Sequence, residues 1–169
     1  EELAEIGLPP PFWAFAWAGG QGLARYLLDN PDTVRGSQVL DFATGSGLVA
    51  IAAAKAGAAD VVAADIDPFC VAAVRLNAAA NGASVAFEAR DLVDEHVDFD
   101  VLLAGDVFYD RAFAERLLPW FARLSATGTT ILVGDPGRSY LPRERLTKLA
   151  EYHVPVTRAL VDAEVKRTT

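Results

Sequence analysis

Short runs of almost continuous apolar residues recur along this chain, a pattern typical of strands that are covered on both faces of a parallel sheet. Longer segments between them are rich in alanine or have apolar residues at helical spacing, which predicts helices. The predicted strands cover residues 38–40, 60–64, 84–88, 99–105 and 129–133. The predicted helices cover residues 48–56, 67–81, 111–124 and 143–150. This alternation predicts five β–α units and therefore an α/β fold.

Two closing segments, 154–161 and 165–169, are typical of strands with no helix between them. We expect these strands to pair antiparallel at one edge of the sheet. The chain has 169 residues, no internal repeat and no low-complexity linker, so it is long enough for one domain with a full core and short for two. A single domain is therefore predicted.

The charge pattern argues against a nucleic acid as partner. The formal net charge is −8, from 23 acidic and 15 basic residues, and no run of Lys or Arg could follow a phosphate backbone. No apolar run reaches the length of a membrane span, so no membrane partner is expected. Cys70 is the only cysteine, and His96 and His153 lie far apart in the sequence, so we expect no metal site.

Acidic residues follow successive predicted strands at the positions where the strands end. These residues are Asp41, Asp65, Asp91 and Asp106. Because ligands of open α/β sheets bind at the carboxyl ends of the strands, the four carboxylates are expected to line one crevice.

A loop with two glycines, Gly45 and Gly47, separates the first strand from the helix that follows it. Small residues there let a ligand approach backbone N–H groups, and Asp65 stands where nucleoside-binding folds place the carboxylate for ribose hydroxyls. The same glycines could serve only a tight turn between strand and helix. The third glycine of the dinucleotide fingerprint is missing, which favours a cofactor without phosphates over an NAD-dependent oxidoreductase.

Four aromatic residues stand close together near the start of the chain, namely Phe12, Trp13, Phe15 and Trp17. They would either pack a first helix onto the sheet or form a lid that covers the ligand. Aromatic faces attract cations, so such a lid suits a sulfonium or an ammonium group.

Three motifs resemble those of class I methyltransferases that use S-adenosylmethionine. Residues 41–47, Asp-Phe-Ala-Thr-Gly-Ser-Gly, resemble the first motif, and residues 65–68, Asp-Ile-Asp-Pro, resemble the second. Residues 106–109, Asp-Val-Phe-Tyr, match the Asp-x-x-Tyr motif of seven-strand protein-lysine methyltransferases. The segments 10–14, 17–21, 27–31 and 134–138 are similar to the lysine methyltransferases of the electron transfer flavoprotein β subunit. The resemblance covers nearly the whole chain.

The resemblance implies an α/β fold of the Rossmann-like class I methyltransferase type. Its mostly parallel sheet would have seven strands in the order 3-2-1-4-5-7-6, with helices on both faces and an antiparallel hairpin at one edge. One methyltransferase domain would cover residues 1–169, with an aromatic lid and substrate segment over 1–30 and a core over 38–169.

The resemblance also implies the residues that hold the cofactor. Asp41 would help to bind its ammonium group, Asp65 would accept hydrogen bonds from its ribose, and Asp91 with Leu92 would hold adenine. Ala43 replaces the first glycine of the family's loop, and we expect its methyl group to require a negative φ. The residues expected at the cofactor are Trp13, Trp17, Asp41, Ala43, Gly45, Gly47, Asp65, Ile66, Asp91, Leu92 and Asp106.

The catalytic residues implied by the resemblance are Asp106 and Tyr109. Asp106 would orient the substrate lysine rather than act as general base, because its charge stabilises the ammonium form and opposes deprotonation. Loss of the proton to water before the site closes is an open alternative. The residues expected to bind the substrate are Phe12, Trp17, Phe108, Tyr109 and Arg138, with Arg138 meeting an acid on the partner or within its own loop.

The expected reaction is methyl transfer from S-adenosylmethionine, leaving S-adenosylhomocysteine, to lysines of the electron transfer flavoprotein β subunit. A ribosomal or other protein remains open as substrate, and so does a non-catalytic domain that binds the cofactor or a partner. The flavoprotein partner implies the cytoplasm of a bacterium, or the mitochondrial matrix in a eukaryote. We expect a monomer.

Overall fold

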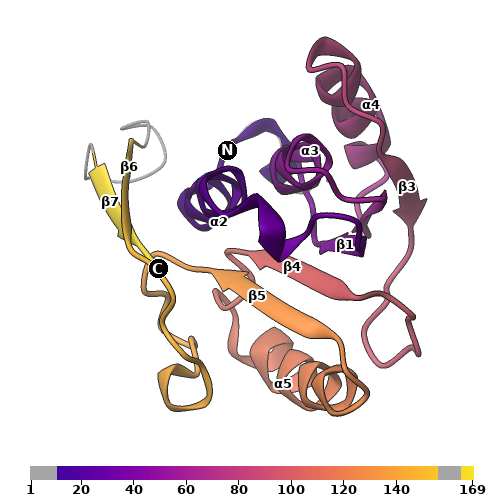
Figure 1. Cartoon of the computed structure of the whole chain (residues 1–169). Coiled ribbons are helices and arrows are strands. Elements are labelled where there is room, and N and C mark those ends of the chain that lie inside the picture. Colours follow the sequence, from indigo (N-terminus) through magenta and orange to yellow (C-terminus); the bar gives the residue numbers. More distant parts are fainter. Residues whose placement is uncertain (1–10, 156–164) are drawn as a thin grey trace, which may run out of the picture.

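The computed structural model describes residues 11–155 and 165–169, and at its centre lies a sheet of five parallel strands (Figure 1). The strands are β1 (Gln38–Phe42), β2 (Asp60–Asp65), β3 (Ala86–Ala89), β4 (Val101–Gly105) and β5 (Thr130–Gly134). Their order is β3-β2-β1-β4-β5, which confirms the predicted order of the first five strands. The order reverses between β1 and β4, the position at which ligands of such sheets bind.

Helices cover both faces of the sheet, as expected (Figure 1). The α-helices are α2 (Ala18–Asp29), α3 (Leu48–Lys55), α4 (Cys70–Ala80) and α5 (Arg111–Ala126). Because side chains alternate along a strand, Val39 and Leu103 pack in the cluster under α2 and α3, whereas Leu40 and Leu102 pack in the cluster under α5. Both clusters are buried, so β1 and β4 are fixed on two sides beside the predicted crevice.

The closing strands form a separate antiparallel hairpin of β6 (Tyr152–Pro155) and β7 (Val165–Thr168). The predicted continuous seven-stranded sheet is therefore wrong, although the hairpin stands on the expected side. Asp135, just after β5, and Thr169, just after β7, exchange two backbone hydrogen bonds of 2.8 and 3.0 Å. Pairing stops there because Pro136 has no N–H to offer and Gly137 turns the chain with a φ of +89°. Part of the predicted strand 154–161 lies outside the described residues.

The helix predicted over residues 143–150 is absent from the described chain, apart from one 3₁₀ turn, η3 (Arg143–Arg145). Leu146 is already extended, and both Leu146 and Leu149 are exposed. A helix is stabilised mainly by packing an apolar face, and this segment has no sheet face to cover. The chain also passes from β3 to β4 without a helix, so the prediction of five β–α units is wrong: among the five parallel strands, an α-helix follows β1, β2 and β4 but neither β3 nor β5 in the described segments.

The aromatic segment near the start of the chain is a single 3₁₀ turn, η1 (Phe12–Ala14), followed by extended backbone at Phe15. The predicted aromatic helix is therefore wrong, and α2 begins only at Ala18. A second 3₁₀ turn, η2 (Pro31–Thr33), leads from α2 toward β1.

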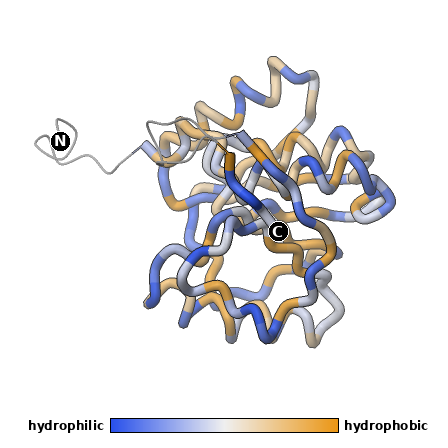
Figure 2. The backbone as a smooth tube through the Cα atoms, turned by 90° about the vertical axis from the view of Figure 1, so that its left-hand side faces the viewer, coloured by the Kyte–Doolittle hydropathy of each residue, from blue (hydrophilic) through white to orange (hydrophobic). Residues whose placement is uncertain are grey.

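Figure 2 shows hydrophobic and hydrophilic residues mixed along the backbone. Within the part of the chain that the structure describes, none of the helices combines the length and apolarity needed to cross a membrane.

Candidate functional site

The carboxyl ends of adjacent strands bring four acids to one edge of the sheet. Asp41 is the second-last residue of β1 and Asp65 is the last residue of β2. Asp106 directly follows β4, and Asp135 directly follows β5. Three of these acids were predicted, and Asp135 was not singled out. The fourth predicted acid, Asp91, follows β3 at the far side of this edge.

Three residues of the glycine loop between β1 and α3 have left-handed backbone. Ala43, Gly45 and Gly47 have φ values of +54°, +55° and +82°. The expectation of a negative φ at Ala43 is therefore wrong. The methyl group of Ala43 packs against the core cluster under α5, and the N–H of Thr44 donates to the carbonyl of Ala64 at 3.0 Å. A left-handed Ala costs about 1–2 kcal/mol, which these contacts must offset.

Asp41 lies inside the protein and holds this loop to the start of α3. Its Oδ2 atom accepts hydrogen bonds from the hydroxyl of Thr44 and from the N–H of Ala50, the latter at 2.9 Å. Burial raises the pKa of this carboxyl to about 7, although both hydrogen bonds act against the rise. Contact with a cofactor ammonium group stays a prediction, whereas the role of Asp41 as the anchor of the loop follows directly from these bonds.

Asp65 lies beside Gly45 and keeps both of its oxygens at the edge of the loop. Oδ2 accepts from the N–H of Gly45 at 3.0 Å, and Oδ1 accepts from the N–H of Asp67 at 3.0 Å. Each oxygen has a second lone pair, so the half-buried carboxylate can also accept from two neighbouring hydroxyls. The next residue, Ile66, is exposed and offers an apolar surface. The donor and acceptor set here fits a nucleoside with its ribose at Asp65.

The predicted adenine site is less open. Asp91 is exposed, but its Oδ1 accepts from the N–H of Val93 and its Oδ2 pairs with Arg116, both at 3.0 Å. Leu92 is buried in the core cluster under α5. Contact of these residues with adenine stays a prediction.

The aromatic turn η1 lies over the glycine loop. A Cβ built on Gly45 would stand 3.8 Å from the Cα of Trp13 and 3.9 Å from the carbonyl oxygen of Phe12. The ring of Trp13 stacks on that of Phe69 at a centroid distance of 6.2 Å, and the indole N–H of Trp17 donates to the carbonyl of Phe12 at 2.8 Å. Since no residue of η1 is buried, the arrangement favours a cover over the loop and not a helix packed onto the sheet.

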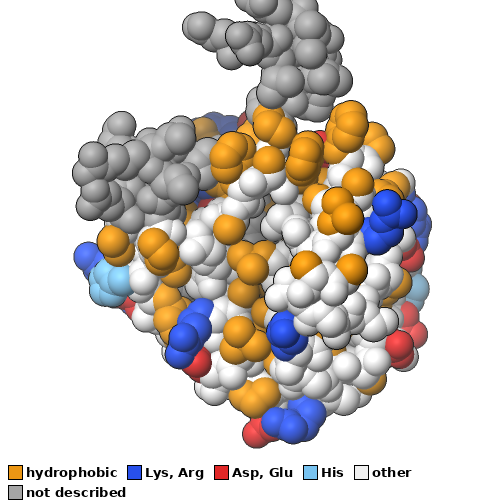
Figure 3. All heavy atoms as spheres, turned by 90° about the horizontal axis from the view of Figure 1, so that it is seen from above, with side chains coloured by type: hydrophobic (Ala, Val, Ile, Leu, Met, Phe, Trp, Pro, Cys, Tyr) orange, Lys and Arg blue, Asp and Glu red, His pale blue; other side chains and the backbone are white. Residues whose placement is uncertain are grey.

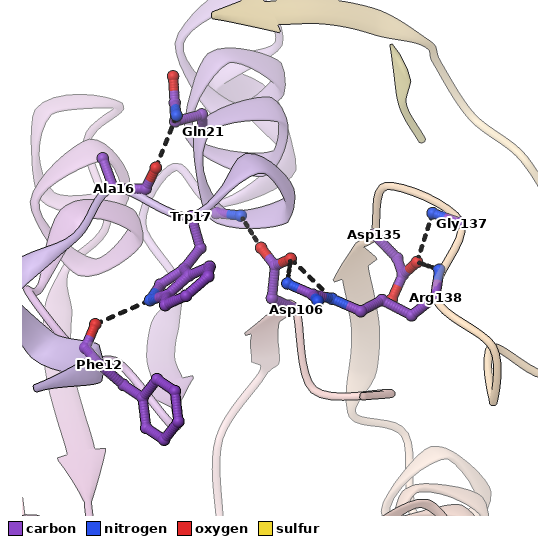
Figure 4. A network of polar contacts seen from close by, with 9 residues as sticks. Phe12, Ala16, Trp17, Gln21, Asp106, Asp135, Gly137 and Arg138 are labelled. Atoms are coloured by element: carbon purple, nitrogen blue, oxygen red, sulfur yellow. Dashed lines mark hydrogen bonds and ion pairs between the residues drawn. The ribbon is translucent and has the colours of Figure 1, made fainter. Parts of the chain in front are cut away.

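Asp106 stands at the centre of the polar network in Figure 4. It is 7% exposed and has a left-handed φ of +59°. Its Oδ2 accepts from the N–H of Gly20 in the first turn of α2 at 3.1 Å, and its Oδ1 accepts from Nε and Nη2 of Arg138 at 3.2 and 2.7 Å. The backbone N–H of Asp106 donates to Gly134 at 2.9 Å, which fixes the residue between α2 and the end of β5.

Arg138 is held from both its backbone and its side chain. Asp135 Oδ1 accepts from the N–H groups of Gly137 and Arg138 at 2.7 and 2.6 Å. The guanidinium group lies 5.8 Å from the centre of the Trp17 ring (Figure 4). Burial raises the pKa of the Asp135 carboxyl, and the two backbone hydrogen bonds act against the rise. Arg138 was expected to meet an acid in its own loop or on a partner, but its side chain instead pairs with Asp106.

The two aromatic residues of the Asp-x-x-Tyr motif point to different places. Tyr109 is 57% exposed, and its ring lies 6.5 Å from that of Phe12. Phe108 is fully buried and packs edge-on against Phe121 at 6.5 Å. The expectation that Phe108 binds the substrate is therefore wrong: it is a core residue that holds the motif onto α5.

Across residues 11–155 and 165–169, no three His, Cys, Asp or Glu side chains are grouped so that they could hold a metal ion. On the face shown in Figure 3, the basic side chains of the described residues stand apart from one another and form no stripe. The site itself combines a glycine loop, a carboxylate for a diol, aromatic faces and a second carboxylate under an arginine.

Known proteins resemble this chain in both sequence and structure. The family model for ribosomal protein L11 methyltransferase (PrmA) matches residues 24–131. An electron transfer flavoprotein beta subunit lysine methyltransferase of Rattus norvegicus is 43% identical over 152 residues, which cover 86% of this chain and 60% of that protein. A homolog of that enzyme in Caenorhabditis elegans is 35% identical over 175 residues, which cover 88% of this chain and 72% of that protein.

The crystal structure of ribosomal protein L11 methylase from Lactobacillus delbrueckii subsp. bulgaricus aligns with a TM-score of 0.60 over 92% of this chain and 80% of that chain. At 24% sequence identity this likeness concerns the fold alone. The chain spans about 60% of the length of the rat relative.

Proposed function

This chain belongs to the methyltransferase family that contains PrmA and the electron transfer flavoprotein β-subunit lysine methyltransferases, and we propose that it transfers methyl groups from S-adenosylmethionine to lysine side chains of a protein. The proposed protein substrate is the electron transfer flavoprotein β subunit, which the names of the relatives support. With such a partner, the protein would work in a bacterial cytoplasm or, in a eukaryote, in the mitochondrial matrix.

One arrangement carries this proposal: Phe12 connects the nucleoside side of the site to the Asp106 side. Its carbonyl oxygen lies against the position of Gly45, and its ring faces that of Tyr109, three residues after Asp106. Methyl transfer requires a cationic cofactor and an amine to meet in line with water excluded. Aromatic faces between two carboxylates suit both partners of that reaction, since the cofactor is a sulfonium and the lysine arrives mostly as an ammonium ion, which must lose a proton before it reacts.

When bound, S-adenosylmethionine supplies a methyl group whose carbon–sulfur bond breaks, with the electron pair left on sulfur, as the lysine nitrogen bonds to the methyl carbon. In the proposed complex, Asp65 accepts from the ribose hydroxyls and the Gly45 loop leaves room for the rest of the cofactor. Asp106 accepts a hydrogen bond from an N–H of the acceptor amine and thereby points the lone pair of the amine nitrogen toward the methyl carbon. The rings of Trp17 and Tyr109 line the entry of the lysine stem, and the surplus proton of the methylated amine passes to water.

A ribosomal protein is the second candidate substrate, because the family model that matches residues 24–131 is the one described for ribosomal protein L11 methyltransferase. The acids and glycines at the sheet edge do not separate the two substrates. A domain that binds the cofactor without turnover is the remaining candidate, and only an activity measurement can separate it from the enzymes.

The experiment is mass spectrometry of purified electron transfer flavoprotein β subunit and ribosomal protein L11, each incubated with this protein and S-adenosylmethionine. The proposal expects mass increments of whole methyl groups on lysines of the flavoprotein subunit. Increments only on the ribosomal protein would select the second candidate. The absence of increments on both proteins, with cofactor binding intact in calorimetry, would overturn the proposed reaction.

Two variants show whether the described site produces those increments. Asp106→Asn removes the carboxylate of the network and is expected to lower the initial rate at least ~10-fold. Asp98→Asn changes an exposed carboxylate on the loop before β4 and is expected to keep the full rate. Equal rates for wild type and Asp106→Asn would place the reaction at another site.

A further inference from the structure

We propose that Arg138 is a positioning residue that cancels the charge of Asp106, so that the acceptor amine can lie against this carboxylate without retaining its proton. This inference rests on the proposed lysine methylation. It concerns how the site handles the acceptor, whatever the identity of the protein that carries the lysine.

A carboxylate alone would be a poor partner for an amine that must react. A lysine has an ordinary pKa of about 10.4, and an opposite charge within about 4–6 Å raises this value by a further 1–3 units. Asp106 is 7% exposed, so water screens its charge little. Without compensation, it would orient the lysine and at the same time hold it in the unreactive ammonium form.

The geometry of the ion pair separates these two effects. Nε and Nη2 of Arg138 both reach Oδ1 of Asp106, at 3.2 and 2.7 Å. Oδ2 accepts a single hydrogen bond, from the N–H of Gly20 at 3.1 Å, which leaves it a lone pair. A neutral amine can therefore donate an N–H to Oδ2 while Arg138 holds the charge at Oδ1.

Arginine suits this task because its guanidinium group keeps its charge throughout the pH range in which lysine titrates. The chain also fixes it in place. Its backbone N–H is bound to Asp135 at 2.6 Å, its side chain is 29% exposed, and its guanidinium lies over the Trp17 ring. Within the described residues, Arg138 is the cation that pairs with Asp106.

Other ionisable groups around the pair do not supply the missing positive charge. Asp135, in the turn after β5, and Asp65, at the end of β2, are both acids. Tyr109 and Asp110 follow Asp106 along the chain, and partial burial together with the charge of Asp110 raises the pKa of the Tyr109 hydroxyl, which keeps it neutral. The first turn of α2 brings the N–H of Gly20 and no acid. Among the residues that the structure describes, loss of Arg138 would thus leave Asp106 without its paired cation.

The test is the pH dependence of kcat from about pH 7 to about pH 11, with saturating S-adenosylmethionine and the flavoprotein β subunit as acceptor. In Arg138→Gln, we expect the midpoint of the rise in kcat to move up by about one pH unit. At neutral pH this shift lowers kcat about ten-fold, and kcat at high pH returns toward the wild-type plateau. The KM for the acceptor is expected to change less than kcat.

Two further variants separate charge from structure. Asp106→Asn combined with Arg138→Gln removes both charges, so the midpoint is expected to return toward that of the wild type although the plateau is lower. Arg145→Gln removes an exposed arginine on η3 and is expected to leave the whole profile in place. Thermal unfolding and cofactor binding of each variant show whether the site remains folded.

A wild-type midpoint in Arg138→Gln would overturn the inference. If the KM for the acceptor also fell, Arg138 would occupy the place of the lysine at Asp106 and be displaced by it. If only thermal stability fell, Arg138 would be a structural residue. These results leave the proposed function standing, because the wild type still methylates lysine. A wild-type protein that methylates no lysine would overturn the proposed function and this inference with it.

Discussion

Gly19 and Asp106 lie so close together that no side chain fits between them: a Cβ built on Gly19 would stand 2.5 Å from Oδ2 of Asp106. It would also overlap the carbonyl oxygen of Gly134. The first turn of α2 can therefore reach the ends of β4 and β5 only because residue 19 is glycine. The hydrogen bond from Gly20 to Asp106 depends on this approach.

Gly19→Ala is consequently expected to push α2 away from Asp106, to lower the free energy of unfolding by about 1–3 kcal/mol and to reduce methyl transfer. Gly20→Ala is the matched control, because its Cβ would meet only Val49, at an ordinary 3.6 Å, and its N–H is retained. Urea unfolding and initial rates check both variants. Equal stability and rate in Gly19→Ala and wild type would contradict the contact described.

Asp65→Ala is expected to weaken binding of S-adenosylmethionine by roughly 1.5–3 kcal/mol, because charge-assisted hydrogen bonds to the ribose and to Gly45 are lost. Titration calorimetry measures this change, and Asp98→Ala serves as control on an exposed loop. Unchanged affinity in Asp65→Ala would move the ribose to another part of the site.

The buried Asp41 makes stability depend on pH. Its pKa is raised to about 7 in the folded protein, so the folded state keeps this proton at pH values at which the unfolded chain has lost it. The contribution of Asp41 to stability therefore falls as the pH rises from about 4 to about 7 and is lost above that range. In Asp41→Asn this dependence disappears, because the amide oxygen accepts both hydrogen bonds without titrating.

Urea unfolding of wild type and Asp41→Asn at several pH values gives the measurement. Between about pH 5 and pH 6.5 the difference in unfolding free energy is expected to move in favour of the variant by about 1 kcal/mol per pH unit. Asp98→Asn corrects for general charge effects. A difference that does not change with pH would show that Asp41 is ionised throughout.

Tryptophan fluorescence reports on the aromatic cover. Of the three tryptophans, Trp13 and Trp17 are half-buried at the site, whereas Trp120 is fully buried under the sheet. Addition of S-adenosylmethionine is expected to change the emission of wild type and of Trp120→Phe to a similar extent. The change should be smaller in Trp13→Phe. A response that disappears with Trp120 would mean that the cofactor acts on the core and not on η1.

Local patterns in the sequence were sufficient to predict the five parallel strands and the acids at the strand ends, whereas the strand order came from the resemblance to class I methyltransferases. A strand that is covered on both faces can be recognised from its own short run of apolar residues. Asp41, Asp65 and Asp106 stand where such runs stop. The region after β5 was predicted poorly, because its helical spacing has no sheet face on which to pack. The backbone of Ala43 was also wrong, since hydrogen bonds between distant segments set that turn.

The pair of Asp106 and Arg138 could not be read from either segment alone, since the two residues come from different strand ends. The strand order contains the missing signal: β4 and β5 are neighbours, so an acid after one and a base after the other meet at the same edge. Phe108 and Tyr109 show the reverse case, in which neighbours in the sequence lie in different surroundings. Adjacent residues after a strand face different sides, and a motif read as a unit conceals that only Tyr109 reaches the surface.

We expect the position of η1 to limit how fast a ligand can enter. The backbone of Trp13 stands in van der Waals contact with the place that a Cβ on Gly45 would take, so a ligand that reaches this side of Gly45 must arrive while the turn is displaced. Opening of a short aromatic segment, and not diffusion, is then expected to set the association rate constant, which would lie well below the diffusion limit of about 10⁹ M⁻¹s⁻¹. The same turn would slow departure of the spent cofactor, which makes product release a candidate for the slowest step of each cycle.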